Sequence, residues 1–185
     1  MIIRKHAAAF FPVLLLAFSF IVMPSVAQDS TSPYPLPEDV TTLDGIIKAY
    51  YEVVSGPAGE PRQTERDQSL HHPDARAIIT GKDREGTPFI RNMTLIEYHD
   101  MAQSGGNPAF YEEEIHRVTQ TFGNVTHVWS TYAWRDAEDG PVRGRGINSI
   151  QLYHDGNRYW ITAWIFDSER DDNPIPAQFL PSEDR

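Results

Sequence analysis

The sequence predicts an α+β fold in which a curved antiparallel sheet wraps around N-terminal helices, giving a cone shape with a pocket. In the first half of the chain, apolar residues recur at helical spacing. Residues 111–170 instead have the pattern of a four-stranded meander, rich in Val, Ile, Thr, Tyr and Trp, with turns that contain Gly, Asn, Asp or Pro. A meander that follows helices is typical of α+β domains.

The N-terminal residues 1–27 have the pattern of a secretory signal peptide. A basic start at Arg4 and Lys5 precedes an apolar run over Phe10–Met23, and Ser25–Ala27 is a small-x-small cleavage signal. An uncleaved membrane anchor is the alternative, but the apolar core is shorter than the roughly 20 residues that a span needs. We therefore expect cleavage after this signal, export to the periplasm or the medium, and no stable membrane insertion afterwards.

The chain of 185 residues contains no cysteine. Disulfides, thiolate zinc sites and a cysteine nucleophile are therefore excluded, and so is a lipid anchor on an acylated cysteine. The formal net charge is −10, and removal of Arg4 and Lys5 leaves 14 basic against 26 acidic residues, a net charge of −12. Such a charge repels phosphate backbones and anionic lipid heads, so we expect no nucleic-acid partner.

The folded domain is expected over 38–170, after an extended leader at 28–37 that contains three prolines. An acidic tail with prolines follows over 171–185. Gly56 and Pro57 end the first helix, because glycine allows a left-handed cap and proline cannot continue a helix. No linker long enough to separate two domains interrupts the sequence, so we expect one domain.

Each helix and strand of the domain is bounded by its own signals. Thr94 and Glu97 form a capping box, in which the two side chains satisfy each other's backbone amides, so a helix begins there. Gly123 with Asn124 is a two-residue hairpin turn that joins two strands. The expected helices are Glu38–Ser55, Thr64–Leu70 and Thr94–Ser104, and the expected strands are Arg76–Thr80, Thr87–Ile90, Glu112–Phe122, Val125–Arg135, Arg143–His154 and Arg158–Asp167.

Helix, short helix, strand, helix and meander thus follow one another, and several short motifs have a familiar form. These motifs are Tyr50-Tyr51, the corner His72–Ala75, Phe122–Val125, Arg145–Leu152 and the hairpin end Asp155–Ile161. Over Asp39–Glu169 the chain resembles the nuclear-transport-factor-two-like superfamily, which includes ketosteroid isomerases and SnoaL-type polyketide cyclases. It looks like an uncharacterised bacterial exported branch of that superfamily. The resemblance implies a cone-shaped fold around a pocket.

For activity, the resemblance implies a carboxylate base about five positions after the Asp-Ala corner of the isomerase branch. Ile78–Thr80 occupy that region here, so steroid-type isomerisation is disfavoured. Tyr50 lies where the superfamily often places a phenol that donates to a carbonyl, although a tyrosine at helical spacing also suits the core. His71 and His72 lack the spacing of a metal pair and are interpreted as a helix end, and we expect no metal and no cofactor.

The hairpin turn divides the two strands beside it into two faces, which a bulge would exchange. We expect the cavity on the face that mixes apolar and polar residues, because ligand sites do so. That face carries Ile115, Arg117, Thr119, Thr121, Thr126, Val128, Ser130, Tyr132 and Trp134. The other face carries Glu114, His116, Val118, Gln120, Phe122, Val125, His127 and Trp129.

The polar side chains expected to bind a ligand come from the first helix and the meander. They are Tyr50, Arg117, Ser130, Tyr132, Arg145 and Asn148. An arginine in an apolar cavity needs an acidic residue or an anionic ligand beside it, so we expect a ligand with an apolar body and a carbonyl, enolate or carboxylate group. The first function expected is small-molecule binding or an accessory role. The alternatives are a cofactor-independent lyase, isomerase or cyclase of the SnoaL type, and a partner-binding protein with an aromatic sheet face.

The last predicted strand is apolar on both faces, so a further element must cover its outer face. Strict alternation places Trp160, Trp164 and Phe166 on one side of it. We expect these aromatic residues to form a homodimer through the sheet face. The alternative cover is the tail at 171–185.

Overall fold

The structure of the protein is a computed structural model, which describes residues 32–182. The predicted signal peptide at 1–27 and the first part of the predicted leader lie outside these residues. Over 32–182, no helix is long and apolar enough to cross a membrane.

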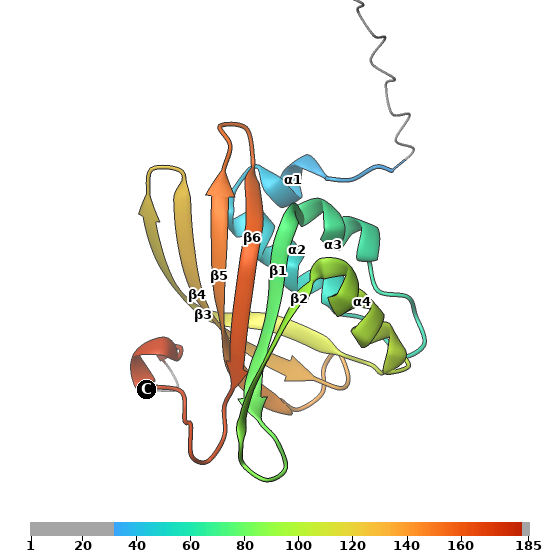
Figure 1. The fold of residues 1–185 in the computed structure, drawn as a ribbon, viewed down its shortest axis with the longest axis vertical. Helices are drawn as coiled ribbons and strands as arrows, with labels where there is room; N and C mark the ends of the chain where they lie inside the picture. The colour runs from blue at the N-terminus through green and yellow to red at the C-terminus, as the bar shows by residue number, and fades with distance from the viewer. Residues whose placement is uncertain (1–31, 183–185) are drawn as a thin grey trace, which may run out of the picture. The chain divides into compact units, whose positions relative to one another are not determined.

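In the part of the chain that is described, four α-helices lie on one side of a six-stranded sheet (Figure 1). The helices are α1 (Pro37–Val40), α2 (Leu43–Val54), α3 (Thr64–Leu70) and α4 (Leu95–Ser104), and the tail contains the 3₁₀ turn η1 (Ala177–Phe179). The strands are β1 (His71–Lys82), β2 (Pro88–Thr94), β3 (Tyr111–Phe122), β4 (Val125–Arg135), β5 (Gly144–His154) and β6 (Tyr159–Ser168). The predicted α+β class is confirmed.

The strands are ordered β2-β1-β6-β5-β4-β3, so β2 and β3 are the edges of a sheet that does not close into a barrel. The predicted meander is confirmed as β3 to β6, each strand antiparallel to the next. β1 pairs with β6 in parallel and with β2 antiparallel. The sheet is therefore mixed, because the last strand of the meander lies beside a strand that comes from the helical half.

The first predicted helix is divided in two. α1 ends at Val40, and α2 begins after Thr42, whose side chain accepts a hydrogen bond from the Gly45 amide at 3.0 Å. A threonine in this position satisfies one of the free amides of a helix start, which favours a new helix over a continued one. Gly45 also fits closely, since a Cβ there would lie 2.1 Å from the Glu38 carbonyl oxygen.

The first two strands are longer than predicted. β1 begins at His71 rather than Arg76, and its pairing with β6 shifts register between these two residues. β2 continues past Ile90 to Thr94, where the predicted capping box starts α4. That capping box is confirmed, with the Glu97 amide donating to the Thr94 hydroxyl at 3.2 Å and the Thr94 amide donating to the Glu97 carboxylate at 2.7 Å.

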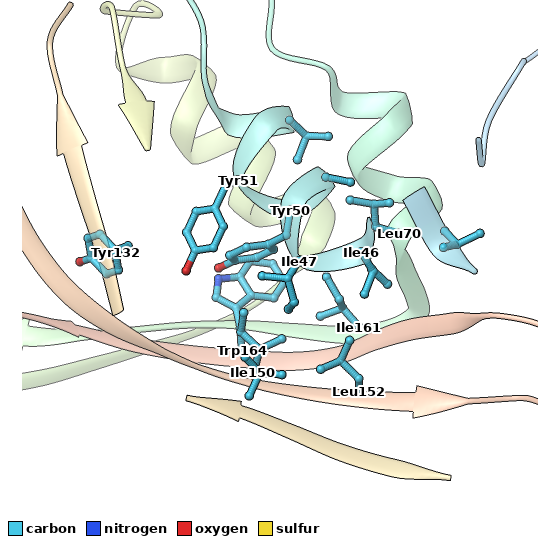
Figure 2. Close-up of a cluster of buried hydrophobic side chains, with 14 of the residues drawn as sticks. Ile46, Ile47, Tyr50, Tyr51, Leu70, Tyr132, Ile150, Leu152, Ile161 and Trp164 are labelled. Carbon is cyan, nitrogen blue, oxygen red and sulfur yellow. The ribbon is translucent and has the colours of Figure 1, made fainter. Parts of the chain in front are cut away.

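The hydrophobic core lies between α2 and the inner face of the sheet (Figure 2). Ile46 of α2 and Ile161 of β6 are fully buried within it. Each such side chain contributes about 1.5–3 kcal/mol by leaving water. Figure 2 shows the rings of Tyr50 and Tyr51 beside these aliphatic residues, with their hydroxyls directed away from Ile46 and Leu70. The core thus has an aliphatic end and a polar, tyrosine-bearing end.

A bulge at Ile115 exchanges the faces of β3. Glu114 is paired with Tyr132 and the next paired residue is His116, so Ile115 has no residue opposite. As a result Glu112 and Glu114 lie on the inner face, and Ile115 lines an outer depression. The predicted grouping of faces is therefore wrong for Ile115 and Glu114. It holds from His116 onward, where the alternation resumes.

A second register shift lies at Thr162 in β6. It breaks the strict alternation from which the outward aromatic residues of this strand were predicted. Trp164 is only 3% exposed and contacts Tyr98 of α4 edge to face, with ring centroids 5.4 Å apart. Phe166 likewise packs against the core, whereas Trp160 is paired with the outward Tyr153. The prediction that Trp160, Trp164 and Phe166 share one face is therefore wrong. A charged residue in place of Trp164 would disrupt the core.

The tail covers part of the outer face of the sheet. Ile175 and Leu180 are each 8% exposed, and Phe179 packs against Trp129 with ring centroids 5.8 Å apart. The Thr131 hydroxyl donates to the Phe179 carbonyl at 2.6 Å, which fixes η1 to β4. Over this part of the outer face, the tail is therefore the covering element, as the alternative prediction held. The homodimer stays a prediction.

Candidate functional site

A cavity of about 440 Å³ opens between α2 and the first half of β3, at the edge of the sheet. Ile47 and Tyr51 of α2 form an apolar and aromatic wall, and Glu112, Glu114 and Arg117 approach from β3. The volume lies in the range of small-molecule sites, and the mixture of an apolar wall with a few polar groups is typical of them. We therefore take this cavity as the candidate site.

Glu112 is a half-buried polar group of the cavity that the protein leaves unsatisfied. The Ile115 bulge directs its side chain inward, opposite Trp134. Its backbone is fixed to α2, because the Glu112 amide donates to the Ser55 hydroxyl at 2.9 Å and that hydroxyl donates to the Tyr51 carbonyl of α2 at 2.8 Å. Its half-buried carboxyl group has no hydrogen bond and no ion pair with any residue from 32 to 182.

Burial raises the pKa of Glu112 to about 8. The cause is the loss of water around the carboxyl, which disfavours the charged form when no cation replaces the water. At neutral pH the carboxyl is therefore mostly protonated and can donate an O–H hydrogen bond. Carboxyl groups with such a pKa are found at functional sites more often than elsewhere, because keeping them unpaired costs stability.

Behind the cavity wall, polar groups of four elements, α2, β3, β4 and β5, form a continuous chain of hydrogen bonds. Asn148 donates through Nδ2 to the Tyr51 hydroxyl at 3.1 Å, and Tyr51 is hydrogen-bonded to Ser130 at 2.6 Å. Since the Ser130 hydroxyl donates to Glu114 at 2.5 Å, the Tyr51 hydroxyl is the donor to Ser130. Tyr50 donates to the Asn148 side-chain oxygen at 3.4 Å. Both tyrosine hydroxyls therefore donate their protons to other groups of the protein.

Burial also raises the pKa of Tyr50 and Tyr51 well above the usual value, and the nearby Glu112 adds to the shift. Both hydroxyls stay protonated across the physiological range. Together with Ser130 and Asn148, which are 0% and 2% exposed, they hold Tyr51 in a fixed position as a wall of the cavity. These residues act on a ligand through Tyr51 rather than by direct contact.

Of the residues expected to bind a ligand, Arg117 lines the cavity, while Tyr132 and Arg145 lie elsewhere. Tyr132 is buried against Gly146, where a Cβ would lie 2.3 Å from the tyrosine oxygen. Arg145 lies on the outer face and binds Glu169 at 2.8 Å. Tyr50, Ser130 and Asn148 belong to the network described above. The structure thus places Arg117 in the cavity and three of the six residues in the network behind it, whereas Tyr132 and Arg145 belong to neither.

The cations that line the cavity are all matched by carboxylates. Arg117 binds both Glu114 and Asp44, each at 2.6 Å. Arg135 binds Glu113 at 2.6 Å, and Lys48 binds Glu52 at 3.0 Å. Glu112 and Glu138, which also line the cavity, have no cation partner within residues 32–182. The potential of the cavity is therefore negative, which favours neutral ligands over anions.

Sequence reasoning missed Glu112 and Glu114 as site residues. The signal was present in the acidic run Glu112–Glu114 at the start of a strand, because at least one of three successive side chains must face inward. Which of them does so depends on the bulge, and a single unpaired residue leaves no pattern of its own. Across residues 32–182, no group of three or more His, Asp or Glu side chains is arranged to hold a metal ion.

Comparison with known proteins finds likeness in fold alone. No family model matches the chain, and no curated protein matches it in sequence. Among solved structures, an NTF2-like protein of unknown function from Shewanella baltica OS155 is 10% identical, with 67% of this chain and 86% of that chain covered and a TM-score of 0.42. An NTF2-like protein of unknown function from Silicibacter pomeroyi DSS-3 is 9% identical, with 69% and 92% covered and a TM-score of 0.47.

LinA is another solved structure with this likeness, 10% identical, with 66% of this chain and 80% of that chain covered and a TM-score of 0.48. NTF2-like proteins, to which the sequence shows a resemblance, are thus among the solved structures that this chain is similar to. Likenesses this distant say nothing about a ligand or a reaction. The function is therefore argued from the cavity itself.

Proposed function

We propose that the protein binds a small organic molecule in the Glu112 cavity, with a carbonyl oxygen of the ligand facing Glu112 and its apolar body against Ile47 and Tyr51. The observation that supports this most is the carboxyl of Glu112, which lines the cavity without a protein partner. A polar group kept away from water without a hydrogen bond costs free energy, and a ligand carbonyl would recover it by accepting the carboxyl proton.

The ligand carries a carbonyl rather than a carboxylate in this proposal. The cavity offers no unmatched cation, since Arg117, Arg135 and Lys48 are each paired. A carboxylate would also meet the unpaired carboxylate of Glu138. Placing an anion beside a like charge is unfavourable, whereas a neutral carbonyl accepts a hydrogen bond from the protonated Glu112 at no such cost.

Binding can be tested by native mass spectrometry of the protein purified from its own cells, followed by titration of the retained ligand. Glu112→Leu removes the donor and should weaken binding by about tenfold or more, because it leaves the ligand oxygen unpaired. Glu112→Gln keeps an N–H donor and should bind within a few-fold of wild type. Glu138→Gln, at an exposed carboxylate of the rim, is the matched control. Equal binding by wild type and Glu112→Leu would contradict the proposal.

A second candidate function is cofactor-independent proton transfer of the isomerase or lyase type. It is favoured by the pKa of Glu112 near 8, since a group with such a pKa can both take and return a proton near neutral pH. In an isomerisation, the Glu112 carboxylate would take a proton from the carbon beside the carbonyl, leaving an enolate. The same proton would then be returned to a different carbon, so the reaction neither consumes nor releases a proton.

The two candidates respond to pH in opposite directions. Binding through the protonated carboxyl should weaken above pH 8, whereas catalysis by the carboxylate should rise with pH and level off above pH 8. Exchange of the ligand's α-hydrogen in D₂O, followed by NMR, measures the second directly. Glu112→Gln should bind yet show no exchange. Exchange that persists in Glu112→Gln would exclude Glu112 as the base.

We further propose, on the sequence pattern alone, that the protein is exported and cleaved after Ala27. The intact mass of protein recovered from its own cells tests this, because cleavage removes Met1–Ala27. A mass that still includes those residues would contradict export by this route.

A further inference from the structure

A second pocket, of about 220 Å³, lies on the other side of α2, among α2, α3, α4 and the loop that precedes β3. Its walls are largely apolar: Val53 and Val54 come from α2, Ala102 from α4, and Pro108 and Phe110 from the loop. The volume corresponds to about seven water molecules at about 30 Å³ each, which suits a compound of roughly eight to ten heavy atoms.

The cation of this pocket, Arg62, has no carboxylate partner in the described part of the chain. Its guanidinium is held by backbone carbonyls, with Nη1 donating to Pro57 at 3.4 Å and Nη2 to Pro108. A guanidinium has five N–H donors, so three of them are left for other acceptors. The other arginines that line the cavities described above, Arg117, Arg135 and Arg145, are all matched by glutamates.

The acidic residue of the pocket, Asp67, forms no ion pair with Arg62, and its carboxylate is hydrogen-bonded to a histidine instead. Asp67 is 4% exposed, and its Oδ2 lies 2.6 Å from Nε2 of His99 while its Oδ1 lies 3.3 Å from Nδ1 of His71. Burial lowers the pKa of His71, so that ring is neutral, and its Nδ1 is hydrogen-bonded to the backbone carbonyl of Asp67 at 2.7 Å. His71 thus fixes the backbone of Asp67, while His99 engages its carboxylate.

The pocket is fixed in shape by the pairing of its two loops. Gly56 and Phe110 exchange backbone hydrogen bonds at 2.7 and 3.0 Å, and the Gly59 amide donates to the Asn107 carbonyl at 2.9 Å. Asn107 has a φ of 45°, a left-handed conformation that asparagine tolerates better than most residues. Arg62 is thus held at the rim of a preformed pocket, which lowers the entropy that a ligand would otherwise have to overcome.

We propose that this pocket is a second ligand site, which takes a small monocarboxylate with an apolar body, the carboxylate on Arg62 and the body against Val53, Val54 and Phe110. Guanidinium and carboxylate match in geometry and charge, and the apolar walls exclude water from the pair. The site is separate from the Glu112 cavity, which lies across α2 and has the opposite unmatched charge. The inference therefore stands or falls independently of the proposed function.

The test uses hexanoate as the probe and hexanamide as its uncharged counterpart. Titration calorimetry on the wild-type chain should show one site for hexanoate with a Kd of about 1 mM or tighter, and hexanamide should bind at least about tenfold more weakly. Methyl NMR should place the hexanoate response on Val53 and Val54. Equal binding of the amide would overturn the proposal. An absence of binding at about 10 mM hexanoate, roughly ten times this Kd, would overturn it as well.

Variants separate the charge from the shape of the pocket. Arg62→Met should weaken hexanoate binding by about tenfold or more, and Arg62→Lys, which keeps the charge without the fork, should fall between it and wild type. Ala102→Phe fills the pocket from the exposed side of α4 and should abolish binding with Arg62 intact. Arg84→Met, at an exposed turn, is the matched control and should bind as wild type. Full affinity in Arg62→Met or in Ala102→Phe would overturn the assignment.

Discussion

The Glu112 cavity and the Arg62 pocket share α2 as a wall, yet they treat charge in opposite ways. In the first, each lining cation is matched, and two carboxyl groups, the half-buried Glu112 and the exposed Glu138, have no cation partner in the described residues. In the second, the carboxylate of Asp67 is hydrogen-bonded to His99, the Asp67 backbone carbonyl is hydrogen-bonded to His71, and one cation, Arg62, has no carboxylate partner within residues 32–182. A buried carboxyl is thus a cost in one place and part of the packing in the other, and the difference lies entirely in its partners.

Trp164 contacts both regions, so its removal should affect both of them. Its ring packs against Tyr98 of the second pocket and, at 5.9 Å, against Tyr50 of the network behind the first. Trp164→Ala should destabilise the protein by about 3–5 kcal/mol, because it removes a large buried ring and leaves a cavity. Urea denaturation followed by circular dichroism measures the loss. Ile165→Ala, beside it on the outer face, is the control and should cost less.

Removal of the ionisable group at Glu112 should change the pH dependence of stability. The pKa of Glu112 is raised from about 4.5 to about 8 on folding, so the folded state is disfavoured as pH rises through this interval. Each unit corresponds to about 1.4 kcal/mol, and after allowance for partial exposure the loss is about 2–3 kcal/mol. Glu112→Gln should therefore match wild type near pH 4.5 and exceed it by this amount at pH 9.

Urea denaturation at the two pH values measures that difference in the free energy of unfolding. Glu138→Gln removes an exposed carboxylate of the same cavity and should leave the pH dependence unchanged. A wild-type stability that stays level from pH 4.5 to pH 9, once the control is subtracted, would show that Glu112 has a partner in solution.

The matched change at Asp67 should have the opposite sign. In Asp67→Asn an amide nitrogen in place of Oδ2 cannot accept from His99, so that hydrogen bond is lost and a buried donor is left unpaired. We expect destabilisation of about 1–2 kcal/mol at pH 7. Differential scanning calorimetry would record it as a lower melting temperature. A stabilising effect would mean that Asp67 resembles Glu112 after all.

The elements that the sequence predicted well are those set by local signals. The Thr94–Glu97 capping box and the Gly123-Asn124 turn depend on neighbours in the chain, and both start the elements expected of them. The two bulges depend on how strands pair across the sheet, which no local pattern reveals. They moved Glu112, Glu114 and Trp164 to faces that strict alternation does not give.

The site was predicted less well than the fold for the same reason. Asn148 and Arg145 lie three positions apart on one strand, so alternation alone places them on opposite faces, and only Asn148 is inside. The unmatched state of Glu112 and of Arg62 was beyond prediction. It depends on which charged side chains the fold brings within reach, and long-range contacts decide that.

The unpaired Ile115 also sets how this fold can change. Deletion of that single residue would leave β3 from His116 onward in place, together with everything that packs on it. Glu114 would then directly precede His116 in an unbroken alternation, so Glu112 and Glu114 would keep their inward faces. If Ile115 were instead paired and the extra residue lay at the start of β3, Tyr111 and Glu113 would turn inward and Glu112 and Glu114 outward. The position of one unpaired residue thus separates two sets of inward side chains on a common scaffold, a short route by which relatives of this chain can diverge in ligand.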